Sequence, residues 1–241
     1  MCGIAGTIFN KNFTLGSEVL LLDFKKIIEN EQLKSEELLE LAWKYKSNIN
    51  FLRFCKNLSE REELSNICTS LELFITKKRL VISSIDKSAS LSPYKQAVKE
   101  CEQMMDAHWF LSEEIHRWVK TIEDLSNSNI SEIDDYKIIF YKDLCKVIHA
   151  IDNRLELRGR DSLGLSIVIN SLDSDDCFVA QPQIDAQQES YHSFDNINYR
   201  THTFTFKVCN SIGGLGDNAS QIRSLIKNNL LFNKLLNDSD I

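Results

Sequence analysis

The second residue of the chain is a cysteine that could serve as a catalytic nucleophile. The sequence begins Met1-Cys2-Gly3-Ile4-Ala5-Gly6. Removal of the initiator methionine, which is easy before a small residue, would leave Cys2 with both a thiol and a free α-amine. The ordinary pKa of an α-amine is about 7.7–8.0, so this group can take the thiol proton and later return one to a leaving amine. A chance cysteine in an apolar strand is the plain alternative.

A second motif lies where a helical pattern gives way to a strand pattern. Residues 155–164 read Leu-Glu-Leu-Arg-Gly-Arg-Asp-Ser-Leu-Gly and continue directly into an apolar segment. An aspartate such as Asp161 readily hydrogen-bonds the local backbone of a turn. Taken alone, Arg158 and Asp161 would also fit a surface ion pair, which contributes little to stability.

Together the two motifs resemble those of the class II, or N-terminal-nucleophile, glutamine amidotransferases. The shared pattern is Met-Cys-Gly-Ile at the N-terminus plus Arg-Gly-x-Asp-Ser-x-Gly at a helix-to-strand junction. The closest similarity is to the glutaminase domain of glutamine:fructose-6-phosphate amidotransferase (isomerizing), where a serine also follows the aspartate, as Ser162 does here. Asparagine synthetases usually carry Pro or Gln where this chain has Arg160, so that reading is disfavoured.

The resemblance implies a reaction and a set of site residues. Cys2 would attack the side-chain amide of L-glutamine, form a glutamyl thioester and release ammonia. Arg158 would lie beside the nucleophile and the glutamine pocket, and Gly159 and Asp161 would shape that turn. No cofactor or metal is implied. The ammonia would serve amino-sugar-phosphate synthesis on a downstream sugar-phosphate isomerase-type domain or subunit.

The fold implied by the resemblance is α+β. It is the α/β/β/α sandwich of N-terminal-nucleophile hydrolases, here incomplete and interrupted by a large helical insertion. Cys2 and Arg158 lie 156 positions apart, a far longer gap than in the usual family member. We therefore expect the amidotransferase core at residues 1–16 and 136–241 and the insertion at residues 17–135. The insertion could serve in regulation, in docking of a partner or in oligomerisation, for example as a homo-oligomer.

The family's later glutamine-binding segments have no counterpart in the sequence. These are a Thr-Arg-Trp-x-Thr-His-Gly stretch, an Asn-Gly pair that forms the oxyanion hole, and an acidic residue that binds the substrate amine. The run Arg200-Thr201-His202-Thr203 has the wrong order. Loss of one oxyanion donor typically lowers acyl-transfer rates by ~10²–10³. We therefore expect these 241 residues alone to be a weak or inactive glutaminase.

Apolar periodicity predicts the helices that would position these motifs. Helical spacing predominates from about residue 17 to residue 155. Ser59 and Glu62 have the form of a capping box that opens one helix, and Ser92-Pro93 resembles another helix start. The apolar stripe of the first of these helices consists of Leu64, Ile67, Cys68, Leu71 and Ile75. Further helices are predicted at about 94–108, 112–125 and 136–155.

Strand patterns lie at the two ends of the chain. Cys2 to Phe9 is apolar and has the pattern of a buried strand. Later strands are predicted at 163–169, at 177–180 and, by its alternation, at 202–208. A glycine turn then leads into a last helix at about 218–236, for which Asp217 is a good N-cap.

Composition indicates a globular protein of the cytoplasm. Hydrophobic residues make up 43%, charged residues 26%, and the net charge is −7, which argues against nucleic acid or an anionic membrane as partner. No apolar run approaches the ~18 residues that span a bilayer. Seven cysteines without a Cys-x-x-Cys pair indicate reduced thiols, most of them buried, rather than a zinc site.

Other polar and aromatic candidates are weaker. His108, His116 and Cys101 are spaced over two helical turns, too far apart for one metal ion. Trp109 and Trp118 lie at helical spacing and are expected in the core. A second function therefore remains beside the enzyme: a non-catalytic, incomplete amidotransferase-like domain whose helical insertion binds a partner.

Overall fold

The computed structural model of the chain describes residues 34–84, 91–150, 162–171, 188–196, 199–209 and 216–237, together with Thr7 and Phe24. The chain divides into two units. The helical unit comprises Asn10–Thr121 and Asn129–Ile139, and the sheet unit comprises Met1–Phe9, Ile122–Ser128 and Phe140–Ile241. Within the described residues, helices are combined with an antiparallel sheet, which confirms the α+β class.

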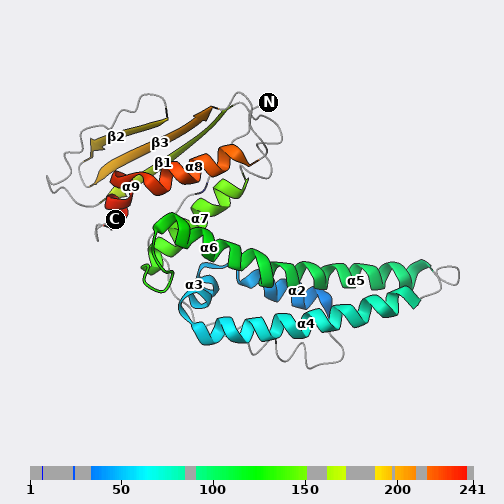
Figure 1. The fold of residues 1–241 in the computed structure, drawn as a ribbon. Helices are drawn as coiled ribbons and strands as arrows, with labels where there is room; N and C mark the ends of the chain where they lie inside the picture. The colour runs from blue at the N-terminus through cyan, green and yellow to red at the C-terminus, as the bar shows by residue number, and fades with distance from the viewer. Residues whose placement is uncertain are drawn as a thin grey trace. The chain divides into compact units, whose positions relative to one another are not determined.

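The helical unit is built around two long helices, α4 and α5. α2 and α4 both pack against α5, and Figure 1 shows α4 and α5 side by side. Two further helices, α6 and α7, contribute residues to both units. The elements are α2 (Ser35–Lys44), α3 (Asn48–Lys56), α4 (Leu58–Ser84), α5 (Leu91–Trp109), the π-helix η1 (Phe110–Glu114), α6 (Ile115–Ser126) and α7 (Asp135–Ala150).

The apolar stripe predicted for α4 is its buried face. Its five members, Leu64, Ile67, Cys68, Leu71 and Ile75, are all buried. Helical spacing puts one side chain on this face at every turn, and α5 covers it. The prediction of this helix and of its inner side is therefore confirmed.

Aromatic rings fill the other end of the helical core. Trp118 meets Phe51 at 5.7 Å and Phe110 at 5.9 Å between ring centroids, both edge to face. Such contacts add ~0.5–1.5 kcal/mol beyond area burial. The prediction that Trp109 is also in the core is wrong, because its side chain is 47% exposed. One residue along a helix turns a side chain by about 100°, so the burial of Phe110 directs Trp109 outward.

The start of α4 differs from the sequence prediction. Asn57, between α3 and α4, has an extended backbone, and its side-chain oxygen accepts the backbone N–H of Glu60 at 3.2 Å. Asn57 is therefore the N-cap, and Ser59 already lies inside the helix, so the capping box is wrong. Asn57 also closes α3, because its N–H donates to the carbonyl oxygen of Arg53 at 2.9 Å. Pro93 likewise is the third residue of α5 rather than its first.

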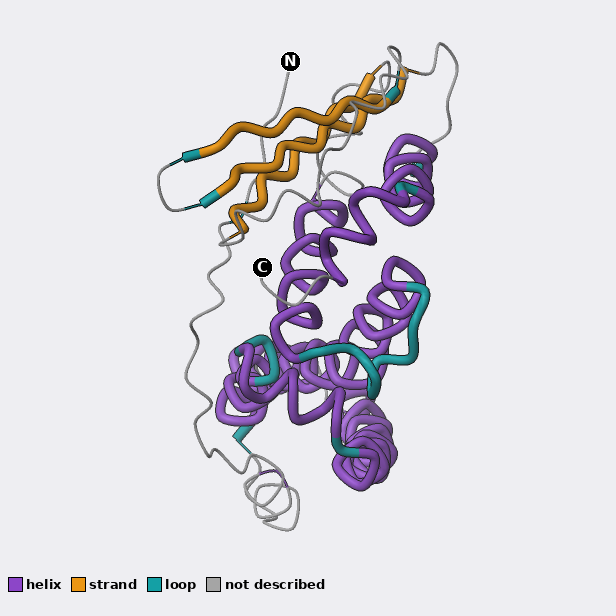
Figure 2. Tube along the Cα trace, turned by 90° about the vertical axis from the view of Figure 1, so that its left-hand side faces the viewer, coloured by secondary structure: helices purple, strands orange, loops and turns teal. Residues whose placement is uncertain are grey.

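The sheet unit contains three described strands, seen as the orange segments of Figure 2. They are β1 (Ser162–Ser171), β2 (Glu189–Asp195) and β3 (Arg200–Cys209). β3 lies in the middle and pairs antiparallel with both neighbours. The predicted strands at 163–169 and 202–208 are thus confirmed as β1 and β3.

One face of the sheet is packed and the other is open. Leu165, Ile167 and Ile169 of β1 alternate with exposed residues, and Phe204, Phe206 and Val208 of β3 continue the buried face. α8 (Asp217–Asn228) packs on β1 and β3. From α9 (Leu230–Asn237), the fully buried ring of Phe232 meets Phe140, Phe204 and Phe206.

Two predictions near the C-terminus are corrected. The helix predicted at 218–236 is broken at Asn229, whose backbone is extended and whose side-chain oxygen accepts the N–H of Phe232 at 2.8 Å. Asp217 is not the N-cap but the first helical residue. There its negative charge interacts favourably with the positive N-terminal end of the helix dipole. The cap is Gly216, whose φ of 92° is a left-handed conformation that favours glycine.

Several predictions fall outside the described residues. The segment 177–180 is one of them, and within Cys2 to Phe9 only Thr7 is described, as an exposed residue in no regular element. We expect a core at residues 1–16 and 136–241 and an insertion at residues 17–135. The two units have different boundaries and do not test this division, which stays a prediction. None of the described helices is long and apolar enough to cross a membrane.

Candidate functional site

The residues of the expected glutaminase site lie outside the described part of the chain. These site residues are Cys2, Arg158, Gly159 and Asp161, and the distances between them are therefore not described. What the structure describes is the frame on either side of the second motif: α7 ends at Ala150 and β1 begins at Ser162.

β1 fixes the position of the motif's last residues in the sheet. Ser162 is opposite Cys209, and Gly164 is opposite Lys207 of β3. The motif therefore enters the sheet beside the C-terminal end of β3. A Cβ added at Gly164 would lie 4.0 Å from the carbonyl oxygen of Phe206, an ordinary van der Waals contact, so that contact does not require a glycine.

At the other end of β1, the sheet buries a histidine between two hydroxyl groups. Nδ1 of His202 lies 2.8 Å from Oη of Tyr191, and Nε2 lies 3.1 Å from Oγ of Ser171. These three residues come from β3, β2 and β1, and none is more than 6% exposed. In a neutral imidazole one ring nitrogen donates and the other accepts, so both hydroxyls can be satisfied at once.

The environment of His202 favours its neutral form. Burial lowers the pKa of His202, the positive charge of Arg200 lowers it further, and Asp195 opposes this. Arg200 and Asp195 are themselves an ion pair at the exposed end of β2 and β3. A neutral imidazole bonded to a serine hydroxyl has the chemistry of a base beside a nucleophile, but both partners are enclosed in the packed face. We therefore interpret the cluster as a hydrogen-bonded link between three strands.

This histidine cluster lies at the other end of β1 from Ser162, the first described residue of the motif. Ser162, at the motif, and Ser171, in the cluster, stand at opposite ends of a ten-residue strand, which places them ~30 Å apart. In the sequence, the inward alternation of β3 from His202 through Phe204 to Val208 was the signal that could have placed His202 on the buried face. Its two partners become apparent only from the strand register.

The described cysteines divide by exposure. Cys55, Cys68, Cys101 and Cys145 are buried, and Cys209 is exposed at the end of β3. Burial raises the pKa of both Cys68 and Cys145 to about 12, so neither is a thiolate near neutral pH. The expectation that most thiols are buried is confirmed for four of these five residues.

The helical unit buries a carboxylate near the start of α4. Glu60 is 4% exposed and receives a hydrogen bond of 3.4 Å from Oη of Tyr45, while Nε of Arg53 lies 3.5 Å from its second oxygen. Glu60 is thus a buried carboxylate that pairs with the partly exposed Arg53 and has a tyrosine hydroxyl on its other oxygen. Among the described residues, no set of three or more His, Cys, Asp or Glu side chains could hold a metal ion.

No protein-family model matches the chain, and neither the curated proteins nor the solved structures include a match. The resemblance to glutamine amidotransferases therefore rests on the motif residues themselves.

Proposed function

We propose that the chain is the glutaminase portion of a glutamine-dependent amidotransferase, acting in amino-sugar-phosphate synthesis. The observation that carries the proposal is the combination of Met1-Cys2-Gly3-Ile4 with the Arg158–Gly164 motif. The fold proposed with it is the α/β/β/α sandwich of N-terminal-nucleophile hydrolases. Each motif alone has a plain alternative, whereas their combination is specific for the superfamily and suggestive of the sugar-phosphate enzymes within it.

The described frame supports the proposal. β1 starts immediately after Asp161, and β3 is followed by α8, as the helix-to-strand motif and the later strand-to-helix segment require. The sheet has helices on one face and leaves exposed residues on the other, among them Ser166, Val168 and Lys207. An antiparallel sheet covered by helices on one side is half of such a sandwich.

The proposed reaction divides amide hydrolysis into two steps. The sulfur of Cys2 forms a bond to the side-chain carbonyl carbon of glutamine while the α-amine of Cys2 takes the thiol proton. The carbon–nitrogen bond then breaks, and the departing nitrogen takes that proton and leaves as ammonia. Water next hydrolyses the thioester to give glutamate and free Cys2. Arg158 would bind beside the nucleophile, and Gly159 and Asp161 would hold the turn.

The test is alkylation of the intact protein by 6-diazo-5-oxo-L-norleucine, a glutamine analogue that traps such cysteines. We expect mass spectrometry to show loss of Met1 and one adduct, mapped to Cys2 and suppressed by excess L-glutamine. Cys209→Ser, which removes the described exposed thiol, should leave the adduct unchanged, and Cys2→Ser should abolish it. Labelling is the suitable readout because the expected turnover of these residues alone is weak.

Either of two results would overturn the proposal. Retained Met1 would block the α-amine and exclude the mechanism. Loss of Met1 without a glutamine-protected adduct would mean that no glutamine site forms around Cys2. Both results would favour the alternative, a non-catalytic, incomplete amidotransferase-like domain whose helical insertion at residues 17–135 binds a partner. A specific feature of α4, described next, favours that second role independently.

A further inference from the structure

The side of α4 that faces away from its buried stripe carries large apolar residues. Leu73, Leu80 and Val81 are 62%, 67% and 62% exposed. At about 100° per residue, Leu73 and Leu80 lie about 180° and 160° from the buried Leu64, whereas Val81 lies about 100° from it, at the edge of the outward side. We call Leu73, Lys77, Leu80, Val81 and Ser84 the outer face of α4. Single exposed apolar residues are ordinary, but two on the outward side of one helix and a third at its edge, within nine positions, form a strip.

The hydroxyl groups around this strip turn back onto their own helix. Ser70 donates to the carbonyl oxygen of Asn66 at 3.1 Å, Thr76 to that of Glu72 at 2.9 Å, and Ser84 to that of Val81 at 2.7 Å. Each donor is therefore satisfied without water or a partner. Covering the outer face would leave none of these hydroxyl protons unpaired, so the charge of Lys77 is the main polar group that a partner would have to pair.

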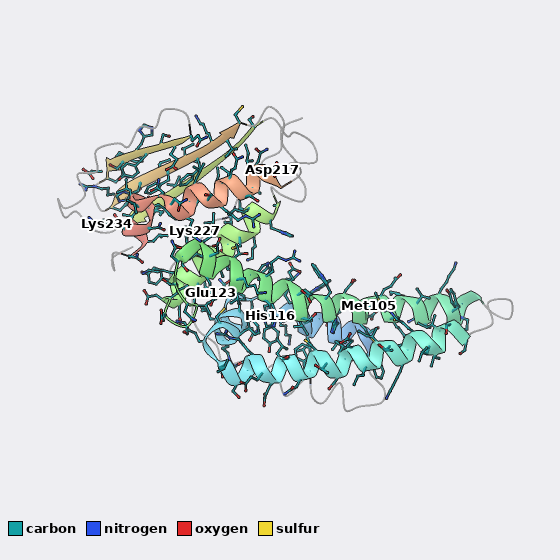
Figure 3. All side chains as sticks on the ribbon, in the orientation of Figure 1. Met105, His116, Glu123, Asp217, Lys227 and Lys234 are labelled. Atoms are coloured by element: carbon teal, nitrogen blue, oxygen red, sulfur yellow. The ribbon has the colours of Figure 1, made fainter. Side chains whose placement is uncertain are left out.

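The basic run Lys77-Lys78-Arg79 divides between the two sides of α4. Lys78 forms an ion pair with Glu100 of α5 at 2.6 Å. Arg79 approaches the sulfur of Met105 on α5 at 3.0 Å, and Figure 3 labels Met105 on that helix. Lys77 instead lies one turn from Leu73 and one turn from Leu80 and Val81, within the outer face. The face is thus an apolar strip with a positive charge near its middle.

We propose that the outer face of α4 docks an amphipathic helix of another protein, with apolar residues against Leu73, Leu80 and Val81 and a carboxylate opposite Lys77. Leu73 and Leu80 are seven positions, or about two helical turns, apart, so both can contact one helix that packs along α4. A second copy of the chain fits less well. Symmetric antiparallel pairing of Leu73 with Leu80 would bring the two Lys77 side chains together, and like charges oppose association. The inference does not depend on the chemistry of Cys2.

The test uses two synthetic amphipathic helical peptides with identical apolar residues, one with glutamates and one with lysines on the flanking positions. Binding to the full chain is measured by fluorescence anisotropy. We expect the acidic peptide to bind at least tenfold more tightly than the basic one, and Lys77→Glu to reverse the preference. Leu80→Ser should weaken binding at least tenfold. The control is Leu58→Ser, because Leu58 is 66% exposed on the same helix but lies outside the outer face.

Three results would overturn the proposal. Equal affinity for both peptides, or an equal loss with Leu58→Ser, would show non-specific apolar binding. Sedimentation as a dimer that Leu80→Ser dissociates would assign the face to a second copy. A lower urea midpoint for Leu73→Ser and Leu80→Ser than for Leu58→Ser would mean that the chain covers this face with its own residues. Urea unfolding also confirms that each variant folds.

Discussion

The hydroxyl group of Tyr191 lies 2.8 Å from Nδ1 of His202, joining β2 to β3 within the packed face of the sheet. Tyr191 is the only residue of β2 that is buried, so this hydrogen bond is the buried side-chain link of that strand to β3. Backbone pairing with β3 holds the rest of β2, together with contacts of its end residues: Glu189 with Asn229 and Asp195 with Arg200.

Loss of this hydroxyl should therefore weaken the sheet unit. We expect Tyr191→Phe to lower the free energy of unfolding by ~1–3 kcal/mol, because a buried ring nitrogen of His202 loses its partner. Tyr199→Phe is the matched control, since Tyr199 is 41% exposed, and should change little. Urea denaturation measures both. Equal effects of the two substitutions would show that the His202 contact contributes nothing.

The buried histidine should also make stability depend on pH. The folded pKa of His202 is held below its ordinary value of 6.5 by burial, so at acidic pH the unfolded chain binds a proton that the folded chain excludes. His202 therefore has no effect on stability well above pH 6.5. Below that pH it lowers the free energy of unfolding progressively, until the folded imidazole also binds a proton. The slope for one such group is at most about 1.4 kcal/mol per pH unit.

Urea unfolding between pH 5 and pH 8 checks this pH dependence. His202→Asn should reduce the slope, whereas His192→Asn, at an exposed position of β2, should retain it. Part of the slope should remain in His202→Asn, because burial also lowers the pKa of His116 in the helical unit. An unchanged slope in His202→Asn would contradict the assignment.

Phe232 should be among the most sensitive positions of the sheet unit. Its ring is fully buried and meets three phenylalanines, so Phe232→Ala should cost ~3–5 kcal/mol through lost contacts and a cavity. Leu230→Ala on the same helix is the control, because Leu230 is 78% exposed, and should stay within ~0.5 kcal/mol. Thermal unfolding followed by circular dichroism distinguishes the two, and similar melting temperatures would refute this packing.

The N-terminus of α4 offers a direct comparison of two caps. Asn57→Ala should lower the free energy of unfolding by ~1 kcal/mol, because the N–H of Glu60 loses its acceptor. Ser59→Ala should have almost no effect, although the sequence pattern assigns the capping role to Ser59. Urea unfolding measures the free energy of unfolding of both variants. A larger decrease for Ser59→Ala than for Asn57→Ala would show that Ser59 is the cap after all.

Thiol reactivity should follow exposure. Among the described cysteines, Cys209 should react with a general thiol reagent in the native protein within minutes, while the four buried ones react only after unfolding. Cys209→Ser should remove one fast-reacting thiol in a colorimetric titration. Rapid native labelling of Cys68 or Cys145, located by peptide mapping, would contradict the burial that raises their pKa.

Apolar periodicity was enough to predict α4, β1 and β3, because each buries one continuous side against a neighbour. β2 was missed for the opposite reason. Its sequence, Glu-Ser-Tyr-His-Ser-Phe-Asp, buries a single side chain, and backbone hydrogen bonds to β3 stabilise the strand. The cap of α4 was misplaced because Asn57 and Ser59 are both good capping residues, and only the end of α3 decides between them.

The sequence likewise pointed to only some of the candidate functional residues. Cys2 and Arg158 were selected by motif residues, and their expected juxtaposition remains a prediction. The cluster around His202 could not be predicted, because Ser171 and Tyr191 lie 31 and 11 positions from His202 in the sequence. Antiparallel pairing with β3 brings these positions together, and no local pattern encodes that register.

The central place of β3 has a consequence for synthesis on the ribosome. β1 and β2 precede β3 in the chain, yet each of them pairs with β3, so neither strand has its partner until Cys209 has left the exit tunnel. α2 to α5 are complete long before that point and can pack while translation continues. During this interval the apolar residues of β1 would be open to chaperones. A slow stretch of codons after β3 should therefore favour correct folding, whereas one between β1 and β3 should favour aggregation.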